Sequence, residues 1–173
     1  MTEPGPIRDS DDPPPTAGGG SPASRDQALA ELGNRIFFRL YQAANMMHKT
    51  GTRALESKGV TTQQWAVIGA LSRPQAHEGM SVGELARFLM VSRQNLTVVV
   101  ARLEKQGYLT RVRDAADGRS RRLRLTPDGQ ALWQGIVPLI FDYYEQALDE
   151  FGVGERAGFL VQLERLIANM KRL

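Results

Sequence analysis

The chain of 173 residues can hold one domain with a hydrophobic core but not two of ordinary size, and its 42% hydrophobic and 24% charged residues are typical of a globular protein. No run approaches the roughly 18 apolar residues of a membrane-spanning helix and the first 25 residues do not look like a secretion signal, so we expect a cytoplasmic protein. The absence of cysteine excludes disulfides, thiol nucleophiles and cysteine-bound zinc. The net charge of +3 is concentrated in residues 81–129, which hold ten Lys or Arg against five Asp or Glu, and this segment is expected to meet a polyanion.

At the N-terminus, residues 1–25 are rich in Pro, Gly and acidic side chains, which predicts a disordered tail without a secretion signal. A helix is expected from about Asp26 to residue 58, because Gly59 is suited to a helix C-terminus. Its apolar side chains recur at three- and four-residue spacing: Leu29, Leu32, Ile36, Leu40, Ala43 and Met47.

Two capping-box signatures mark the next helices. Thr61 with Gln64 predicts the start of a second helix, which Pro74 ends. Ser81 with Glu84 predicts the start of a short third helix.

A helix-turn-helix is expected at this point. Ser92 is a favourable N-cap for a fourth helix that ends at Gly107, and residues 90–92 form a short turn between the third and fourth helices. This is the arrangement that places a recognition helix in the major groove of DNA.

After Gly107 the periodicity changes to alternation, which predicts a β-hairpin with its turn at Asp117 and Gly118. The expected inward side chains are Thr110, Val112, Leu123 and Leu125, and the expected outward ones are Arg111, Arg113, Arg122 and Arg124.

Two C-terminal helices are expected at residues 128–151 and 155–171, with Thr126 as the N-cap, Pro127 at the first position and a kink at Pro138. Their apolar surface exceeds what one small domain can cover, which predicts contact with a second chain. The fold class expected from all elements is mainly α with a small β-hairpin wing: a winged helix-turn-helix plus a helical dimerisation domain.

The outward face of the fourth helix carries amides, a hydroxyl, cations and small apolar groups, which match what base edges offer in the major groove. Gln94 and Asn95 can pair with adenine, and Val98 can contact a thymine methyl. The candidate DNA contacts of this helix are Arg93, Gln94, Asn95, Thr97, Val98 and Arg102. The opposite face is expected to pack on the preceding helix: Leu96, Val99, Val100 and Leu103.

The hairpin is expected to supply a second DNA contact. Arg119 can enter a minor groove, and Asp117 can hold this arginine in place. Arg121, Arg122 and Arg124 are expected near phosphates. The alternative is a hairpin charged only to prevent aggregation, but Lys would serve that purpose equally well and these cations are all Arg.

The segment DGRSRRLRLTPDG resembles the wing signature of the MarR (multiple antibiotic resistance regulator) family, approximately D-x-R-S-x-R-x-x-x-L-T-x-x-G. The preceding VSRQNLTVVVARLEKQGYLTR resembles that family's recognition helix, and the resemblance covers roughly residues 28–171. It implies an obligate homodimer: residues 26–58 and 127–173 supply the dimerisation helices, and residues 60–126 form a winged helix-turn-helix. It also implies a transcriptional repressor that binds a palindromic operator.

The resemblance further implies an effector crevice between the dimerisation and DNA-binding regions. The stretches TTQQWAVIGALSRP and MSVGELARFLMVSRQNLTVVVARLEKQGYL resemble, within the family, regulators of aromatic-acid breakdown, notably of hydroxycinnamates. The implied effector is therefore an aromatic acid or its coenzyme A thioester, which releases the operator. Cations for the thioester phosphates are available at Arg35, Arg39, Lys49, Arg53 and Lys58.

By position, the candidate effector-binding residues are Arg39, Tyr41, Asn45, His48, Arg53, Trp65, Arg73 and Tyr144. For Trp65 and Tyr144 the alternative is a structural role in the core. His48 and His77 are too isolated to indicate a metal site, so no metal or cofactor is expected.

Other classes of function are weaker alternatives. The sequence contains no nucleophile–base set, no paired carboxylates at a plausible site and no phosphate loop, so we do not expect an enzyme. A ligand-independent winged helix that binds DNA or docks on protein is the remaining alternative, and release from DNA by a metabolite would separate the two.

Overall fold

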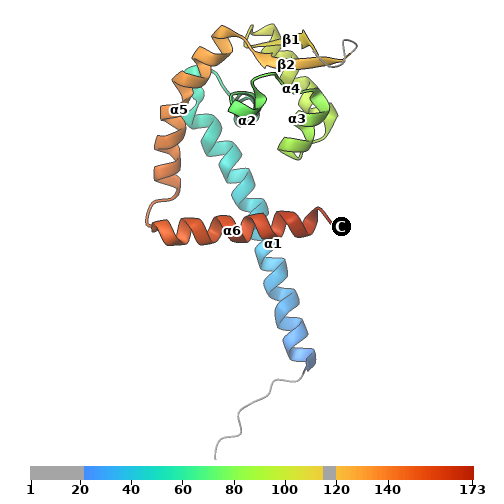
Figure 1. Ribbon diagram of the computed structural model, residues 1–173. Coiled ribbons are helices and arrows are strands. Elements are labelled where there is room, and N and C mark those ends of the chain that lie inside the picture. Colours follow the sequence, from blue (N-terminus) through green and yellow to red (C-terminus); the bar gives the residue numbers. More distant parts are fainter. Residues whose placement is uncertain (1–21, 115–119) are drawn as a thin grey trace, which may run out of the picture. The chain divides into compact units, whose positions relative to one another are not determined.

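The computed structural model describes residues 22–114 and 120–173, so the predicted hairpin turn at Asp117 and Gly118 and most of the predicted tail lie outside the described residues. The described chain confirms the predicted mainly α fold with one antiparallel β-hairpin (Figure 1). The elements are α1 (Pro22–Ala54), α2 (Thr62–Leu71), α3 (Val82–Leu89), α4 (Arg93–Lys105), β1 (Leu109–Arg113), β2 (Arg121–Leu125), α5 (Pro127–Ala147) and α6 (Val153–Met170), with 3₁₀ turns at Glu56–Lys58 and Pro74–Ala76. Among the described helices, none combines the length and the hydropathy needed to span a bilayer.

Helix boundaries differ from the expected ones by a few residues. α1 already begins at Pro22, and it ends at Ala54, before the expected residue 58. The N–H of Leu55 is shared between the carbonyls of Gly51 and Thr52, both at 3.2 Å, and this marks the change from α-helix to a 3₁₀ turn. Gly59 ends that turn with φ of 64°, a conformation that favours glycine.

Local side-chain hydrogen bonds determine where the later helices start. Both predicted capping boxes are confirmed, Thr61 with Gln64 and Ser81 with Glu84. In each box a side-chain oxygen accepts from a backbone N–H that the helix leaves without a partner, which stabilises the first turn. Thr126 caps α5 in the same way, by accepting from the N–H of Gly129 at 3.0 Å, and α5 continues through Pro138 as one helix.

The core joins α2, α3, α4 and the hairpin. Its most deeply buried side chains, at most 1% exposed, include Ile68, Leu85, Leu103 and Leu123. A second cluster places Leu55 and Val60 against Ile136 and Ile140 of α5. Leu132 and Trp133 of α5 pack against both clusters, so α5 is anchored on the winged helix.

The chain divides within α1 into two compact units, the first ending at Ala43 and the second spanning residues 44–173. The C-terminal part of α1 therefore belongs with the winged helix, α5 and α6. This division after residue 43 does not coincide with the predicted boundaries near residues 59 and 126 between dimerisation and DNA-binding regions. Those functional boundaries stay a prediction.

Candidate nucleic-acid interface and ligand pocket

The predicted helix-turn-helix is present as α3 and α4. α3 ends at Met90, whose φ of 56° and ψ of 39° place it in the left-handed region. Its N–H bonds back to the carbonyls of Ala86 and Arg87, which closes the helix. Ser92 then starts α4 by accepting from the N–H of Asn95 at 3.2 Å, so residues 90–92 form the predicted turn.

The two faces of α4 differ as the sequence indicates. Leu96, Val100 and Leu103 are buried in the core, and Val99 is half-buried. The other face is exposed along the helix and includes all six candidate DNA contacts: Arg93, Gln94, Asn95, Thr97, Val98 and Arg102. Val98 is 65% exposed, so its methyl groups are accessible on this face.

Arg93, at the start of α4, lies against α3. A Cβ placed on Gly83 would be 3.0 Å from Nη2 of Arg93, so the guanidinium covers this glycine. The Thr97 hydroxyl donates to the Arg93 carbonyl at 2.7 Å, one turn earlier in the same helix. The Arg93–Gly83 contact joins the first turn of α4 to α3, the Thr97 bond lies within α4, and Gln94 and Asn95 stay exposed.

The register of the hairpin corrects the predicted faces of β1. Leu109 pairs with Leu125, and Arg111 pairs with Leu123, so these four side chains share one face. Thr110 lies on the other face, opposite Arg124, and Val112 lies opposite Arg122 on that same face. The expected inward position of Thr110 and Val112 is therefore wrong. The buried face begins one residue earlier, at Leu109, which is 4% exposed.

Arg111 occupies the inner face because its charge is neutralised there. Its Nε and Nη2 donate to the two carboxylate oxygens of Glu104 on α4, at 2.7 and 3.1 Å. This paired geometry raises the pKa of the Arg111 guanidinium. An ion pair consequently fastens β1 to the recognition helix, where the alternating pattern suggested an outward, free arginine.

Arg122 also has a different role from the predicted phosphate contact. Its guanidinium donates to the Gly79 carbonyl at 2.8 Å and to Asp114 Oδ2 at 2.9 Å, and it lies 3.3 Å from Glu84 Oε2. Hydrogen bonding to Asp114 and the charge of Glu84 raise its pKa. A capping bond from the Ser81 N–H, aided by the Arg122 charge, lowers the pKa of Glu84. Arg122 therefore ties the hairpin to α3 and to the preceding loop.

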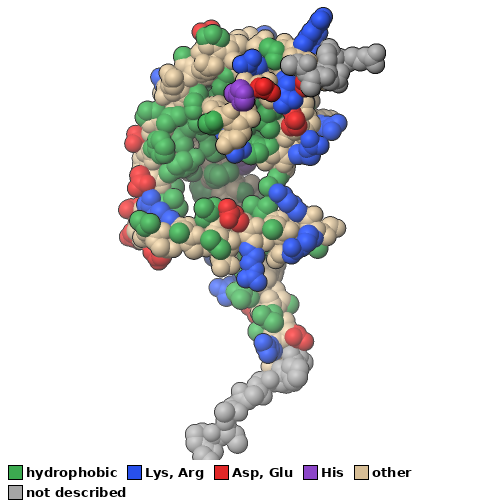
Figure 2. Space-filling view, viewed as in Figure 1, with side chains coloured by type: hydrophobic (Ala, Val, Ile, Leu, Met, Phe, Trp, Pro, Cys, Tyr) green, Lys and Arg blue, Asp and Glu red, His purple; other side chains and the backbone are tan. Residues whose placement is uncertain are grey.

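The remaining hairpin arginines are available to solvent. Arg113, Arg121 and Arg124 are exposed, and Figure 2 shows Lys and Arg side chains gathered over the side of the molecule where α3, α4 and the hairpin lie. Asp117 and Arg119 lie outside the described residues. Exposed cations of this region therefore lie on the recognition helix and on both faces of the hairpin.

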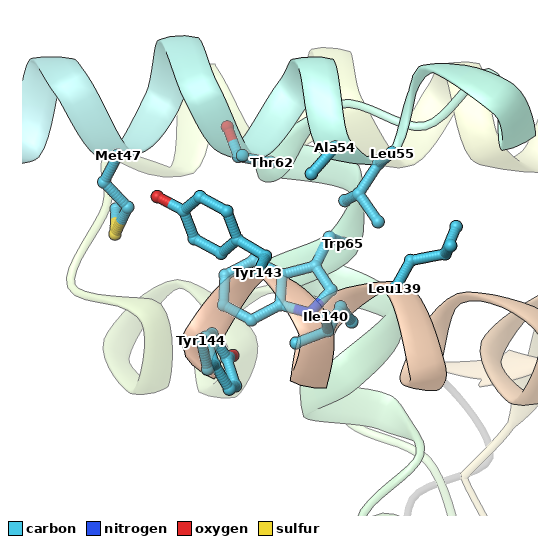
Figure 3. A pocket seen from close by; sticks show the side chains of 10 residues that line it. Met47, Ala54, Leu55, Thr62, Trp65, Leu139, Ile140, Tyr143 and Tyr144 are labelled. Atoms are coloured by element: carbon cyan, nitrogen blue, oxygen red, sulfur yellow. The ribbon is translucent and has the colours of Figure 1, made fainter. Parts of the chain in front are cut away.

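A separate apolar pocket lies between the C-terminal part of α1, the start of α2 and the middle of α5. Its volume is about 40 Å³, and it is lined by Met47, Gly51, Ala54, Leu55, Thr62, Trp65, Leu139, Ile140, Tyr143 and Tyr144. Figure 3 shows the Tyr143 ring extending from α5 toward α1. The lining is therefore mostly aliphatic and aromatic, as in pockets for small organic ligands.

Few polar groups border this pocket, and most are paired. The Tyr143 hydroxyl is 2.9 Å from Thr50 Oγ1, and the Thr62 hydroxyl is 2.8 Å from His48 Nδ1. Burial raises the pKa of Tyr144, so its phenol stays neutral. Trp65 Nε1 is the one side-chain nitrogen or oxygen of the described residues that is buried without a hydrogen-bond partner. An unpaired buried N–H is costly, so this group can still bind an acceptor.

The predicted effector residues are only partly gathered here. Trp65 and Tyr144 line the pocket, and His48 borders it through Thr62. The others lie elsewhere: Arg53 lines a neighbouring hollow, Arg73 stacks 4.6 Å above the Phe88 ring, Asn45 is exposed on α1, and Arg39 and Tyr41 belong to the first unit. The sequence reasoning missed Met47 and Tyr143, although Tyr143 is next to the candidate Tyr144.

Comparisons with known proteins agree with this architecture. The model of the MarR family matches residues 58–120. The chain is 53% identical over 147 residues to a transcriptional activatory protein, BadR of Rhodopseudomonas palustris, covering 84% of each chain. It superposes on a MarR/EmrR family transcriptional regulator from Acinetobacter sp. ADP1 with a TM-score of 0.74 and 21% identity, covering 82% of this chain and 99% of that one.

A further solved structure with the same fold contains a ligand. CouR from Rhodococcus jostii RHA1, bound to p-coumaroyl-CoA, matches with a TM-score of 0.69 and 20% identity, covering 78% of this chain and 93% of that one. The relatives and the fold are those of DNA-binding transcriptional regulators and not of enzymes. The chain therefore belongs to the MarR family of winged-helix transcriptional regulators.

Proposed function

We propose that this chain is a homodimeric regulator that binds a palindromic operator in the cytoplasm and changes its DNA affinity when an aromatic carboxylate, free or as its coenzyme A thioester, occupies the pocket between α1, α2 and α5. The observation that carries the effector class is an apolar, aromatic pocket whose one unpaired buried donor is Trp65 Nε1.

DNA reading is assigned to the exposed face of α4. Gln94 and Asn95 offer amides for adenine edges, and Val98 offers a methyl contact for thymine. Arg93, Thr97 and Arg102 are proposed to position the helix on phosphates and bases. From the hairpin, the proposed contacts are Arg121 at a phosphate and Arg119 in the minor groove with Asp117 beside it. Arg122 is not proposed as a DNA contact, because its guanidinium is bonded to Asp114 and to the Gly79 carbonyl.

A homodimer is supported by apolar side chains that the single chain leaves exposed on the helices outside the winged helix. On α1 they are Leu29, Leu32, Ile36, Phe37, Phe38 and Tyr41, and on α5, α6 and their connection they are Phe141, Phe151, Val153, Phe159, Leu160 and Val161. Exposed apolar patches mark protein–protein interfaces, so a second copy is the proposed cover for these side chains.

The size of the pocket bears on how a ligand would act. A cavity of about 150 Å³ is known to hold benzene, whereas this pocket measures about 40 Å³. An aromatic ligand must therefore separate α1, α2 and α5 as it enters. Because α2 packs on the recognition helix, an occupied pocket would favour a different domain geometry from an empty one.

A thioester would need cations beyond the pocket. Lys49 and Arg53 line a neighbouring hollow of about 350 Å³, together with Thr52, Thr61 and one carboxylate, Glu56. Thr52 is 3.4 Å from Thr62 of the pocket through their hydroxyls, so the hollow and the pocket lie side by side. This pair of cations supports phosphate binding, and the p-coumaroyl-CoA complex of CouR supports the same ligand class.

The direction of regulation is proposed from the relatives. The family resemblance led us to expect repression, but the relative with 53% identity is named an activatory protein. That name favours activation, and a reporter assay with and without the protein separates the two directions.

Removing the indole N–H is expected to weaken carboxylate binding specifically. Trp65→Phe keeps an aromatic ring but deletes the donor, and a hydrogen bond to a charged group contributes about 1.5–3 kcal/mol, so affinity for cinnamate should fall roughly tenfold or more. Calorimetric titration measures the cinnamate affinity, and cinnamamide serves as the uncharged control ligand. The matched control variant is Trp133→Phe, whose side chain does not line the pocket. Equal cinnamate affinity in wild type and Trp65→Phe would contradict the assignment.

A further inference from the structure

A buried amide connects the start of α2 to the end of the recognition helix. Gln64 is 3% exposed, and its Oε1 accepts from the Thr61 N–H at 3.0 Å. That bond fixes the orientation of the amide, so Nε2 points outward from α2 and donates to Gln106 Oε1 at 2.9 Å. Gln106 is the C-terminal cap of α4, with its own N–H bonded to the Arg102 carbonyl at 3.0 Å.

The same turn of α2 is fastened to α1 at the ligand pocket. Thr62 is 6% exposed and lines the pocket. Its hydroxyl is 2.8 Å from His48 Nδ1, and its N–H donates to Thr52 Oγ1 at 3.3 Å. One helical turn is thus bonded to α1 beside the pocket through Thr62 and to the C-terminal end of α4 through Gln64.

We infer that Gln64 and Gln106 are positioning residues that carry displacement of Thr62 at the pocket to the recognition helix. The inference rests on the proposed function, in which a ligand enters beside Thr62. Gln64 is too buried to exchange its partner for water, so breaking its bond to Gln106 leaves an unpaired amide. When the first turn of α2 moves, the end of α4 therefore moves with it.

Packing alone would transmit such a movement differently. Val67 and Ile68 of α2 also pack in the core shared with α4, but apolar contacts are non-directional, so they do not fix one orientation of the two helix ends. The amide bond has a narrow distance and angle range, so it fixes the relative position of two helix ends. Gln106 is exposed, so truncating it removes the bond and leaves the core intact.

Gly51 provides a way to displace Thr62 without any ligand. A Cβ on Gly51 would lie 2.8 Å from Thr62 Cγ2, closer than carbon atoms can approach, so Gly51→Ala must push the α2 turn away from α1. The matched control is Gly135→Ala in α5, where the added carbon meets only the end of the Lys58 side chain at 3.7 Å. The probe is a duplex selected by the wild-type protein from random DNA.

The expected result is non-additivity in DNA affinity. Gly51→Ala should change affinity for the selected duplex at least fivefold in the wild-type background and less than twofold in the Gln106→Ala background, whereas Gly135→Ala should change neither. Adding Thr62→Ser, which removes the colliding methyl, should restore wild-type affinity. An equal effect of Gly51→Ala in both backgrounds, or no effect in either, would overturn the inference.

Folding of the variants does not limit the test. Should Gly51→Ala unfold the protein, Thr62→Val is measured in the same two backgrounds, because it deletes the hydroxyl contacts to His48 and Thr52 while keeping the volume. The same loss of effect in Gln106→Ala is expected, and additivity contradicts the inference. Because this test uses no ligand, a failed search for an effector would reject the proposed function without changing what the DNA affinities say about Gln64 and Gln106.

Discussion

Gly79→Ala is expected to destabilise the protein by about 3–5 kcal/mol, because it combines a strained backbone with a steric collision. Gly79 has φ of +86°, and an added Cβ would lie 2.6 Å from the Leu123 carbonyl oxygen. That oxygen accepts from the Met80 N–H at 3.0 Å, and the Gly79 carbonyl accepts from Arg122. The substitution therefore disrupts both attachments of the hairpin to the preceding loop.

The matched control is Gly107→Ala. Gly107 has nearly the same φ, +80°, but nothing lies within 4 Å of its added Cβ, so only the backbone cost of about 1–2 kcal/mol is expected. Urea unfolding of both variants measures the difference. If the two substitutions cost the same free energy of unfolding, the close approach of Gly79 to β2 does not stabilise the hairpin.

Leu160→Glu is expected to dissociate the proposed dimer and abolish operator binding. Leu160 is 57% exposed on α6 and shares a stripe with Leu163 and Ile167 at three- and four-residue spacing. A carboxylate buried without a partner costs several kcal/mol, so the dimer dissociation constant should rise at least 100-fold, about 2.7 kcal/mol. Analytical ultracentrifugation measures the dissociation, and footprinting measures the loss of two half-sites about 10 base pairs apart.

Leu173→Glu is the control for that variant. It makes the same change of side chain and charge beyond the end of α6 at Met170, outside the stripe of Leu160, Leu163 and Ile167, so dimerisation should be unchanged. A Leu160→Glu protein that remains dimeric and protects both half-sites would show that this stripe of α6 is not in the interface.

The helix-turn-helix was predictable because its signals are local. Ser81, Glu84 and Ser92 cap the helices by bonds that span three residues, and the apolar spacing of α4 fixes which face is buried. The hairpin faces were less predictable. The alternating pattern of β1 is compatible with either set of side chains facing the core. The buried set is determined by Leu109, which is in the core, and by Glu104 of α4, which pairs with Arg111.

The roles of single side chains depended on partners distant in sequence. The sequence around Arg122 suggests a free cation, but its partners Gly79, Glu84 and Asp114 come from other parts of the chain. The pocket likewise combines α1, α2 and α5, so its aromatic candidates Trp65 and Tyr144 were found by residue type, whereas Gly51 carried no sequence signal. Such contacts are set by tertiary packing, and periodicity does not report them.

The central claim, that an aromatic carboxylate controls DNA binding, is tested most directly by fluorescence anisotropy of the selected duplex titrated with the wild-type protein. The titration is repeated with benzoate, with hydroxycinnamates and with their coenzyme A thioesters. Coupling between two sites is typically about 1–3 kcal/mol, so at least one of these ligands should shift the DNA dissociation constant roughly 5- to 150-fold. An unchanged dissociation constant with all of them at millimolar concentration would contradict the proposed function.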